Sequence, residues 1–131
     1  MPVIQSEIDV HGEAFAANRE AMLAAVASFR DVEQKVLDKA HEAKPKFEKR
    51  GQLLPRERIN LLLDPGAPFL ELSSLAGYKL HDDKDGTQAG GGIIAGIGYI
   101  AGVRCLVIAN NSAIKGGTIS PTGLKKSLRM Q

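Results

Sequence analysis

Cysteine, aromatic residues and long apolar runs are all scarce in this 131-residue sequence. Its single cysteine, Cys105, cannot form an internal disulfide, and residues 1–5 lack the basic and apolar regions of a secretory signal. No apolar run approaches the roughly 20 residues that span a bilayer. We therefore expect a cytoplasmic protein with no membrane-spanning segment.

A strong charge of one sign is absent as well. The net charge is +2, the pI is near 8.8, and the aromatic residues are two tyrosines and four phenylalanines. Nucleic-acid-binding chains usually carry a basic stripe interleaved with aromatic side chains. We therefore expect no nucleic-acid partner.

Motifs of catalysis and metal binding are also missing. There is no Walker motif, no zinc-ligand pair and no Gly-x-Ser-x-Gly turn, and the histidines stand singly at His11, His41 and His81. The polar run from His81 superficially resembles a calcium loop. Aligning Gly86 with the turn glycine puts His81 and Gly92 where acidic ligands are required, so we reject calcium. The sequence predicts no metal site.

One glycine motif is misleading. Residues 96–101, GIGYIA, match the dinucleotide fingerprint letter by letter. They lie in a β-rich segment that turns into another strand, whereas the fingerprint needs a strand that turns into a helix. A Rossmann fold is therefore not predicted.

Apolar periodicity predicts the helices of the first half. Residues 13–41 carry apolar side chains at spacings of three, four and seven, which predicts a long amphipathic helix with a mixed, solvated polar face. A basic run over residues 44–50, around Pro45, predicts a helix break. Residues 53–63 predict a short helix with Pro55 in its first turn. The long apolar stripe suggests packing against a partner or another part of the protein.

The second half is rich in strand signals. Residues 69–72 predict a brief strand, and the glycine-rich residues 79–92 predict a mobile loop. Residues 93–99 and 103–109 predict a hairpin around Ala101-Gly102.

The expected hairpin has a definite register. Counting outward from its turn pairs Ile100 with Val103, Gly98 with Cys105, and Gly96 with Val107. The two glycines leave room for another element to approach one face of the first strand. The second strand is apolar on both faces beyond Arg104, so we expect it to be covered on both sides, with Cys105 in the core.

A glycine turn and a basic helix follow the hairpin. Ser120 is placed to cap the helix and Pro121 to begin it. Lys115, Gly116, Gly117 and Thr118 precede them, and Lys125, Lys126 and Arg129 add positive charge. Backbone N–H groups next to cations suggest an anion-binding corner at residues 115–118. An ordinary turn before a solvated helix is the alternative. The residues alone thus predict an α+β segment: a long helix, a short helix, a β-hairpin and a C-terminal helix.

Several motifs resemble one enzyme family. RGQLLPRERI (residues 50–59) and LLDPGAPFLEL (62–72), followed by AGGGIIAGIG (89–98), VIAN (107–110) and KGGT (115–118), are similar to the opening of carboxyltransferase subunits of biotin-dependent acyl-CoA carboxylases. The resemblance covers residues 12–131.

The resemblance also points to a branch of this family. LAGY (residues 75–78) and KGGT resemble the branch that carboxylates 3-methylcrotonyl-CoA and geranyl-CoA. Methylcrotonyl members commonly have Asp-x-Thr before this KGGT and Tyr-Tyr-Pro after it. Residues 111–114 and 119–121 depart from both patterns, which favours geranyl-CoA.

The resemblance implies a crotonase-like ββα superhelix, of which this chain holds the first part. It divides the chain into a helical segment (1–49) and the truncated start of the carboxyltransferase N-terminal domain (50–131). It implies transfer of a carboxyl group from carboxybiotin to a branched enoyl-CoA through an enolate held by backbone N–H groups. Those donors lie beyond Gln131 in the family, so we assign no catalytic residue, and Lys115–Thr118 stand as a possible site for CoA phosphates.

The resemblance implies partners and cofactors too. Biotin sits on a biotin carboxylase/biotin carrier subunit, which alone uses ATP and Mg²⁺, while carboxyltransferase subunits form homo-oligomers and bind the CoA thioester. We expect the 131-residue chain alone to be inactive. A non-enzymatic assembly module and another crotonase-fold enzyme, such as a decarboxylase, are the alternatives.

Overall fold

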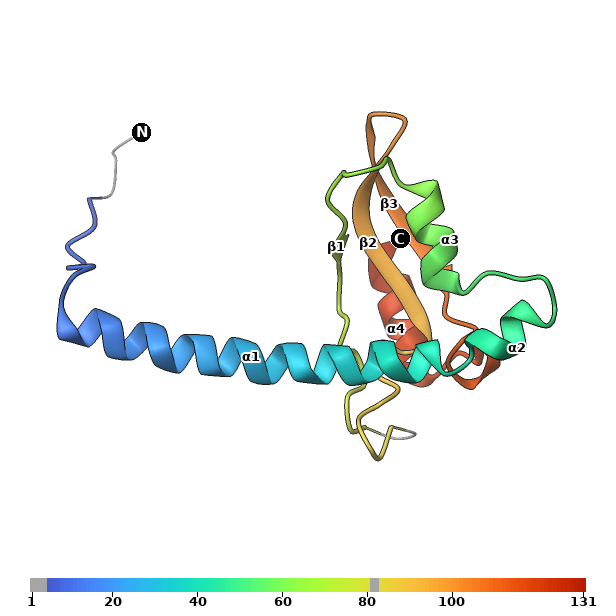
Figure 1. Cartoon of the computed structure of the whole chain (residues 1–131), viewed down its shortest axis with the longest axis horizontal. Helices are drawn as coiled ribbons and strands as arrows, with labels where there is room; N and C mark the ends of the chain where they lie inside the picture. The colour runs from blue at the N-terminus through green and yellow to red at the C-terminus, as the bar shows by residue number, and fades with distance from the viewer. Residues whose placement is uncertain (1–4, 81–82) are drawn as a thin grey trace. The chain divides into compact units, whose positions relative to one another are not determined.

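A computed structural model describes residues 5–80 and 83–131. Figure 1 shows the elements in chain order. They are α1 (Glu13–His41), α2 (Lys44–Glu48), α3 (Pro55–Leu62), β1 (Leu70–Glu71), β2 (Ile93–Ile100), β3 (Val103–Asn110), the 3-10 turn η1 (Lys115–Gly117) and α4 (Pro121–Met130). The contacts divide the chain into two units, Met1–Asp31 and Val32–Gln131, which we describe separately. The prediction of a mixed α+β segment is confirmed.

The first unit holds the beginning of α1. The helix has the predicted bounds, and the Ala16 N–H donates to the Gly12 carbonyl at 3.1 Å. Large apolar side chains of this part are exposed by 43–64%, namely Met22, Leu23, Val26 and Phe29.

The second unit contains two apolar clusters. In one, Val36 and Ala40 from the end of α1 pack with Ala89 and Ile114. The other, formed by α3 and the hairpin, consists of Ile59, Leu63, Ile94 and Val107. The hairpin is thus anchored to α3 by burial of apolar surface.

The segment between α1 and α3 is more helical than the sequence suggests. We predicted only a break around Pro45, but residues 44–48 form the short helix α2 with this proline in its first turn. A proline is compatible with a first turn because its missing N–H has no intrahelical partner there. The basic run therefore folds into a helix and a turn.

Helix α3 follows the prediction closely. It begins at Pro55, and the Glu57 carboxylate accepts the Leu54 N–H at 2.9 Å and pairs with Lys44 Nζ at 3.0 Å. These contacts lower the pKa of Glu57, the Leu54 hydrogen bond first. After the helix, the Asp64 carboxylate accepts the N–H groups of Ala101 and Gly102, each at 2.7 Å. Asp64 thereby ties the end of α3 to the hairpin turn.

The sheet has the order β1-β2-β3 and is antiparallel throughout. The predicted pairs Ile100 with Val103, Gly98 with Cys105, and Gly96 with Val107 are all confirmed. A Cβ at Gly96 would collide with the Phe69 ring, and one at Gly98 would lie 2.5 Å from Leu63. The two glycines therefore admit the close approach that the sequence predicts.

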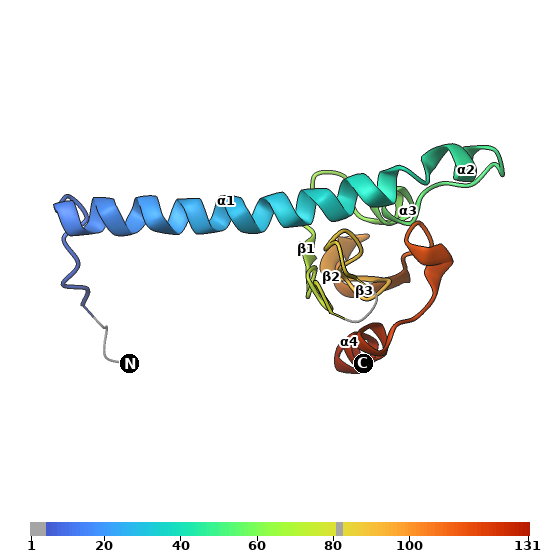
Figure 2. The same cartoon turned by 90° about the horizontal axis from the view of Figure 1, so that it is seen from below.

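Strand β3 is less covered than we predicted. Helices α3 and α4 lie on opposite sides of the hairpin (Figure 2). Val107 is buried on the α3 side, but Leu106 and Ile108 remain 45% and 41% exposed. The prediction of a strand covered on both faces was wrong for this chain, because α4 covers its side only in part. Cys105 is half-buried and belongs to neither cluster.

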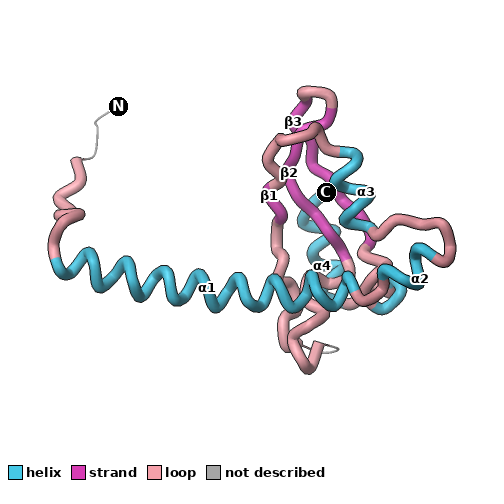
Figure 3. Tube along the Cα trace, viewed as in Figure 1, coloured by secondary structure: helices cyan, strands magenta, loops and turns pink. Residues whose placement is uncertain are grey.

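The connection between β1 and β2 is a loop, as Figure 3 shows, but it is more anchored than predicted. Residues 81–82 lie outside the described part. The buried Asp83 carboxylate accepts the Lys79 N–H at 3.1 Å and the Gln88 N–H at 2.8 Å. Gly90 N–H donates to the Ala76 carbonyl at 2.8 Å. The expectation of a mobile surface loop is not supported from residue 83 onward, because apart from the exposed Lys84 and Asp85 this part is buried or half-buried and is hydrogen-bonded.

Candidate functional site

The predicted corner, residues 115–118, lies in the turn between β3 and α4. Lys115, Gly116 and Gly117 have φ values of 47°, 66° and 85°. Glycine adopts this left-handed region without the steric penalty that other residues meet, which explains the pair of glycines. The turn starts from a fixed point, since the Asn111 N–H donates to the Gly92 carbonyl at 2.8 Å.

The corner satisfies part of its own hydrogen-bonding capacity. The N–H groups of Gly117 and Thr118 donate to the carbonyls of Ile114 and Lys115 at 3.0 and 3.3 Å. The Thr118 hydroxyl also donates to the Lys115 carbonyl, at 2.9 Å. Among the described residues, the Gly116 N–H has no backbone partner. The Gly116 N–H of this turn is therefore open to a ligand.

Helix α4 begins as predicted. Ser120 is its N-cap, its hydroxyl accepts the Gly123 N–H at 3.0 Å, and Pro121 is the first helical residue. Gly123 packs directly on the glycine-rich turn before β2, because a Cβ at Gly91 would lie 2.6 Å from the Gly123 Cα. Backbone contact thus fixes the first turn of α4 against residues 90–92.

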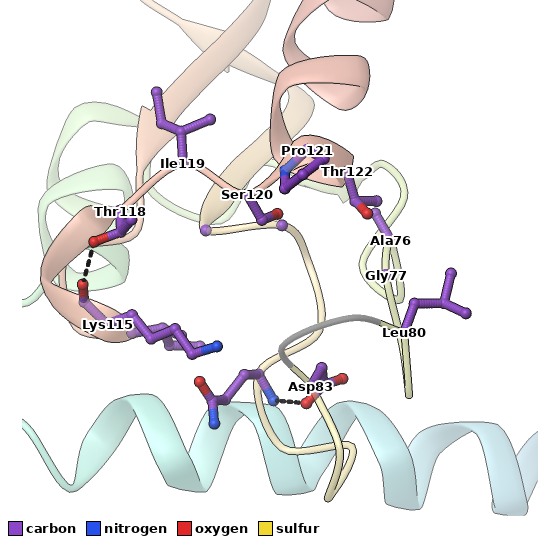
Figure 4. Close-up of a pocket in the computed structure, with 14 residues that line it drawn as sticks. Ala76, Gly77, Leu80, Asp83, Lys115, Thr118, Ile119, Ser120, Pro121 and Thr122 are labelled. Carbon is purple, nitrogen blue, oxygen red and sulfur yellow. Dashed lines mark hydrogen bonds between the residues drawn. The ribbon is translucent and has the colours of Figure 1, made fainter.

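A hollow of about 100 Å³ lies between the corner and this contact. Its lining residues come from two stretches that are distant in the sequence. The first contributes residues from 76–80 and 83–92, and the second contributes residues from 114–122. Figure 4 shows the Lys115 side chain directed into it, near Asp83. Lys115 and Thr118 of the predicted corner line this hollow, together with the capping residue Ser120.

The positive charge of α4 does not all serve this corner. Lys126 is buried, and its Nζ donates to the carbonyls of Ile93, Ser73 and Gly90 at 2.7, 3.1 and 3.3 Å. Burial, opposed by Glu71, lowers the pKa of Lys126 to about 8. Our expectation that Lys126 adds positive charge near the corner was wrong, because its side chain is enclosed by carbonyl groups. Lys125 and Arg129 are exposed on α4.

A second hollow, of about 380 Å³, adjoins the other side of the corner. Lys115 and Gly116 line it together with residues from α2 and the turn that follows. From the sequence, we interpreted the basic run at residues 44–50 only as a helix break. Its positive charge was the signal that could have pointed to a binding role, because Lys46 and Arg50 of this run line the second hollow.

Two kinds of feature are absent from the part of the chain that the structure describes. In residues 5–80 and 83–131, no three metal-ligating side chains gather at one place. No helix in the same part is both long and apolar enough to cross a membrane.

The chain is similar to subunits of acyl-CoA carboxylases. The carboxyl transferase domain family matches residues 45–131. The methylcrotonoyl-CoA carboxylase beta chain of Arabidopsis thaliana is 44% identical over 98% of this chain, and the probable Drosophila melanogaster one is 42% identical over 98%. The chain spans 22% of the length of each.

Solved structures show the same relationship. The crystal structure of the P. aeruginosa geranyl-CoA carboxylase beta subunit is 82% identical, with a TM-score of 0.86 over 98% of this chain and 24% of that subunit. The transcarboxylase 12S structure shares the fold alone, at 21% identity and a TM-score of 0.70 over 83% of this chain and 22% of that one. Together with the observed elements, these matches confirm the first part of the crotonase-like carboxyltransferase fold. The chain belongs to the carboxyl transferase domain family.

Proposed function

We propose that the intact protein is the carboxyltransferase subunit of a biotin-dependent acyl-CoA carboxylase, a C–C bond-forming ligase. It transfers a carboxyl group from carboxybiotin to a branched enoyl-CoA. One observation carries this proposal: the 82% identity over 98% of the chain to a geranyl-CoA carboxylase beta subunit. At such identity, and with a TM-score of 0.86, the two chains share the fold.

Geranyl-CoA is the substrate we propose first. The same identity supports it, as do the departures at residues 111–114 and 119–121 from the pattern common in methylcrotonyl members. 3-Methylcrotonyl-CoA is the second candidate, since relatives with that name are 42% and 44% identical over 98% of the chain.

The corner at residues 115–118 contributes a phosphate contact in this proposal. Two features support it: the Lys115 side chain directed into the hollow (Figure 4) and the Gly116 N–H at the left-handed turn. An ammonium group and a backbone N–H both bind phosphate oxygens well. The catalytic N–H groups belong to other parts of the intact subunit.

The proposal includes the setting in which the subunit acts. Biotin is carried by a biotin carboxylase/biotin carrier subunit, which uses ATP and Mg²⁺, and carboxyltransferase subunits form a homo-oligomer within a cytoplasmic hetero-oligomer. Within the chain, residues 1–49 are a helical segment and residues 50–131 begin the N-terminal domain. The family match from residue 45 supports this division.

The decisive assay uses the intact subunit with its biotin-bearing partner, ATP, Mg²⁺ and bicarbonate. We expect carboxylation of geranyl-CoA at a higher kcat/KM than of 3-methylcrotonyl-CoA, and none when the partner or ATP is omitted. Thioester decarboxylation without ATP would instead favour a decarboxylase. A lack of any acyl-CoA turnover or binding would favour an assembly module. The 131-residue chain in place of the intact subunit is expected to be inactive.

The corner has its own test. Replacing Lys115 by Gln should raise KM for the acyl-CoA with little change in kcat, because a contact to the phosphates is the same in the ground and transition states. Lys125→Gln, on the exposed face of α4, is the matched control. Equal KM values for both variants would remove Lys115 from the proposed site.

A further inference from the structure

Lys126 is not among the described residues that line the smaller hollow, yet it holds two segments that do. Its Nζ donates to the carbonyls of Ile93, Ser73 and Gly90 at 2.7, 3.1 and 3.3 Å. Ser73 follows β1, and the other two residues flank the glycine turn before β2. One ammonium group on α4 therefore joins both segments to the helix.

The glycine turn supplies one wall of this hollow. Gly91 and Gly92 line it, and they stand between the two residues, Gly90 and Ile93, whose carbonyls Lys126 holds. The φ values of the three glycines run from 67° to 100°. Glycine has more backbone freedom than any other residue. The shape of this turn therefore depends on the contacts that hold its two ends.

Hydrogen bonds connect the glycine turn to the corner. The Gly92 carbonyl accepts the Asn111 N–H at 2.8 Å. The Asn111 carbonyl in turn accepts the Ile114 N–H at 3.1 Å, and the Ile114 carbonyl accepts the Gly117 N–H at 3.0 Å. The contacts therefore lead from Lys126 through the glycine turn to the residues of the corner.

The charge of Lys126 strengthens the first of these contacts. The side chain is buried, and the charged groups that act on it are Glu71 and Arg56, which pair with each other at 2.7 Å. Burial lowers the pKa of Lys126 to about 8, Glu71 opposes this shift and Arg56 adds to it. The ammonium form thus prevails at neutral pH. Hydrogen bonds from a charged donor are stronger than those from a neutral one.

We propose that Lys126 is a positioning residue for the corner, because it holds the glycine turn against α4 and thereby fixes residues 111–118. Lys126 contacts no ligand itself and acts through Gly90, Ile93 and Asn111. The inference rests on the proposed function for the ligand of the corner, the phosphates of an acyl-CoA. The chain of hydrogen bonds from Lys126 to the corner can be tested without that ligand.

The first experiment measures amide hydrogen exchange of residues 111–118 in the intact subunit. In Lys126→Ala, these amides should exchange about tenfold faster or more, because loss of a charged donor favours the open form of the turn. The substitution leaves space for n-propylammonium, which matches the lysine side chain beyond Cβ and should restore slow exchange. n-Propanol has a similar size but no charge, and it should not.

The second experiment uses the carboxylase assay. Lys126→Ala should raise KM for the acyl-CoA about tenfold, with a smaller change in kcat, because a phosphate contact is the same in the ground and transition states. n-Propylammonium should lower KM again. A KM that does not change in a working carboxylase overturns the inference.

Two controls separate positioning from a general loss of stability. Lys125→Ala removes an exposed lysine from the same helix. Gly98→Ala overpacks the α3 side of the hairpin, where a Cβ would lie 2.5 Å from Leu63, and so destabilises the fold away from the glycine turn. Neither variant should change the exchange of residues 111–118 or KM, and n-propylammonium should affect neither. Thermal unfolding of each variant measures its stability.

Three results of the exchange experiment overturn the inference. They are wild-type exchange of residues 111–118 in Lys126→Ala, an equal acceleration in Gly98→Ala, and equal rescue by n-propanol and n-propylammonium. If Lys126→Ala does not fold, Lys126→Met takes its place in the comparison with Gly98→Ala. Failure of the proposed function is a separate outcome. A wild-type complex that carboxylates no acyl-CoA refutes that function, while the exchange experiment still decides the role of Lys126.

Discussion

Two glycine runs, at residues 90–92 and 116–117, both have positive φ values but have opposite surroundings. Gly91 has a φ of 67° and Gly116 a φ of 66°. A Cβ at Gly91 would lie 2.6 and 2.7 Å from the Cα and N of Gly123, whereas one at Gly116 would meet nothing within 4 Å. The first run permits close packing of backbone on backbone, whereas Gly116 in the second run lies in a turn with open space beside it.

Replacing Gly91 and Gly116 separately by alanine tests most directly whether their different surroundings matter. Gly91→Ala should lower the free energy of unfolding by about 3 kcal/mol or more, since overpacking adds to the steric penalty of a left-handed alanine. Gly116→Ala should lower it by about 1–2 kcal/mol, which is the steric penalty alone. Chemical denaturation of the intact subunit measures both. Equal losses would mean that contact with α4 does not constrain Gly91.

The buried lysine sharpens the same contrast, because Lys126 Nζ donates to the carbonyl of Gly90, the first residue of that run, and to the carbonyl of Ile93, which follows the run. Lys126→Met should lower the free energy of unfolding by about 2 kcal/mol, since three enclosed carbonyl oxygens lose their donor. The exposed control Lys125→Met should stay within about 0.5 kcal/mol of wild type. If Lys126→Met left the free energy of unfolding unchanged, water or a backbone shift would have to satisfy the carbonyl groups in place of the ammonium group.

The titration of Lys126 adds a pH dependence. Burial lowers the pKa of Lys126 to about 8 from 10.5. Between these values the unfolded chain binds more protons than the folded one, so the unfolding free energy should rise with pH from about 8 to 10.5. Lys126→Met should lack this rise, which denaturation of both proteins across this range measures. A parallel pH dependence of the two would contradict the lowered pKa.

The smallest effect is expected at the open run. Gly116→Asn should destabilise the subunit less than Gly116→Ala, because asparagine tolerates the left-handed region better. We expect a difference of a few tenths of a kcal/mol, about 0.5 at most, measured by the same denaturation. If asparagine were the more destabilising of the two, the turn would be sterically closed and unavailable to a ligand.

Local signals predicted much of the fold. The bounds of α1, the start of α3 at Pro55, the hairpin register and the Ser120 cap follow from periodicity, proline and turn chemistry, which act within a few residues. The exposure of Leu106, the burial of Lys126 and the anchoring of Asp83 did not follow, because each depends on segments far apart in the chain.

The candidate site divides in the same way. Residues 115–118 were found from glycines and a lysine in one stretch. The basic charge of residues 44–50 is visible in the sequence. The hollow that Lys46 and Arg50 line was not predicted, because no local pattern indicates that α2 lies beside the turn after β3.

Sequence alone determined which glycines turn, where helices start and which family the ordered motifs resemble. Tertiary structure decided which of the two glycine runs is buried, which lysine is enclosed and which basic residues share a hollow. The physical reason is that backbone conformation is set by neighbours in the chain. Burial and charge environment are set by neighbours in space: Gly91 and Gly116 have nearly equal φ values, but only Gly91 is packed against another segment.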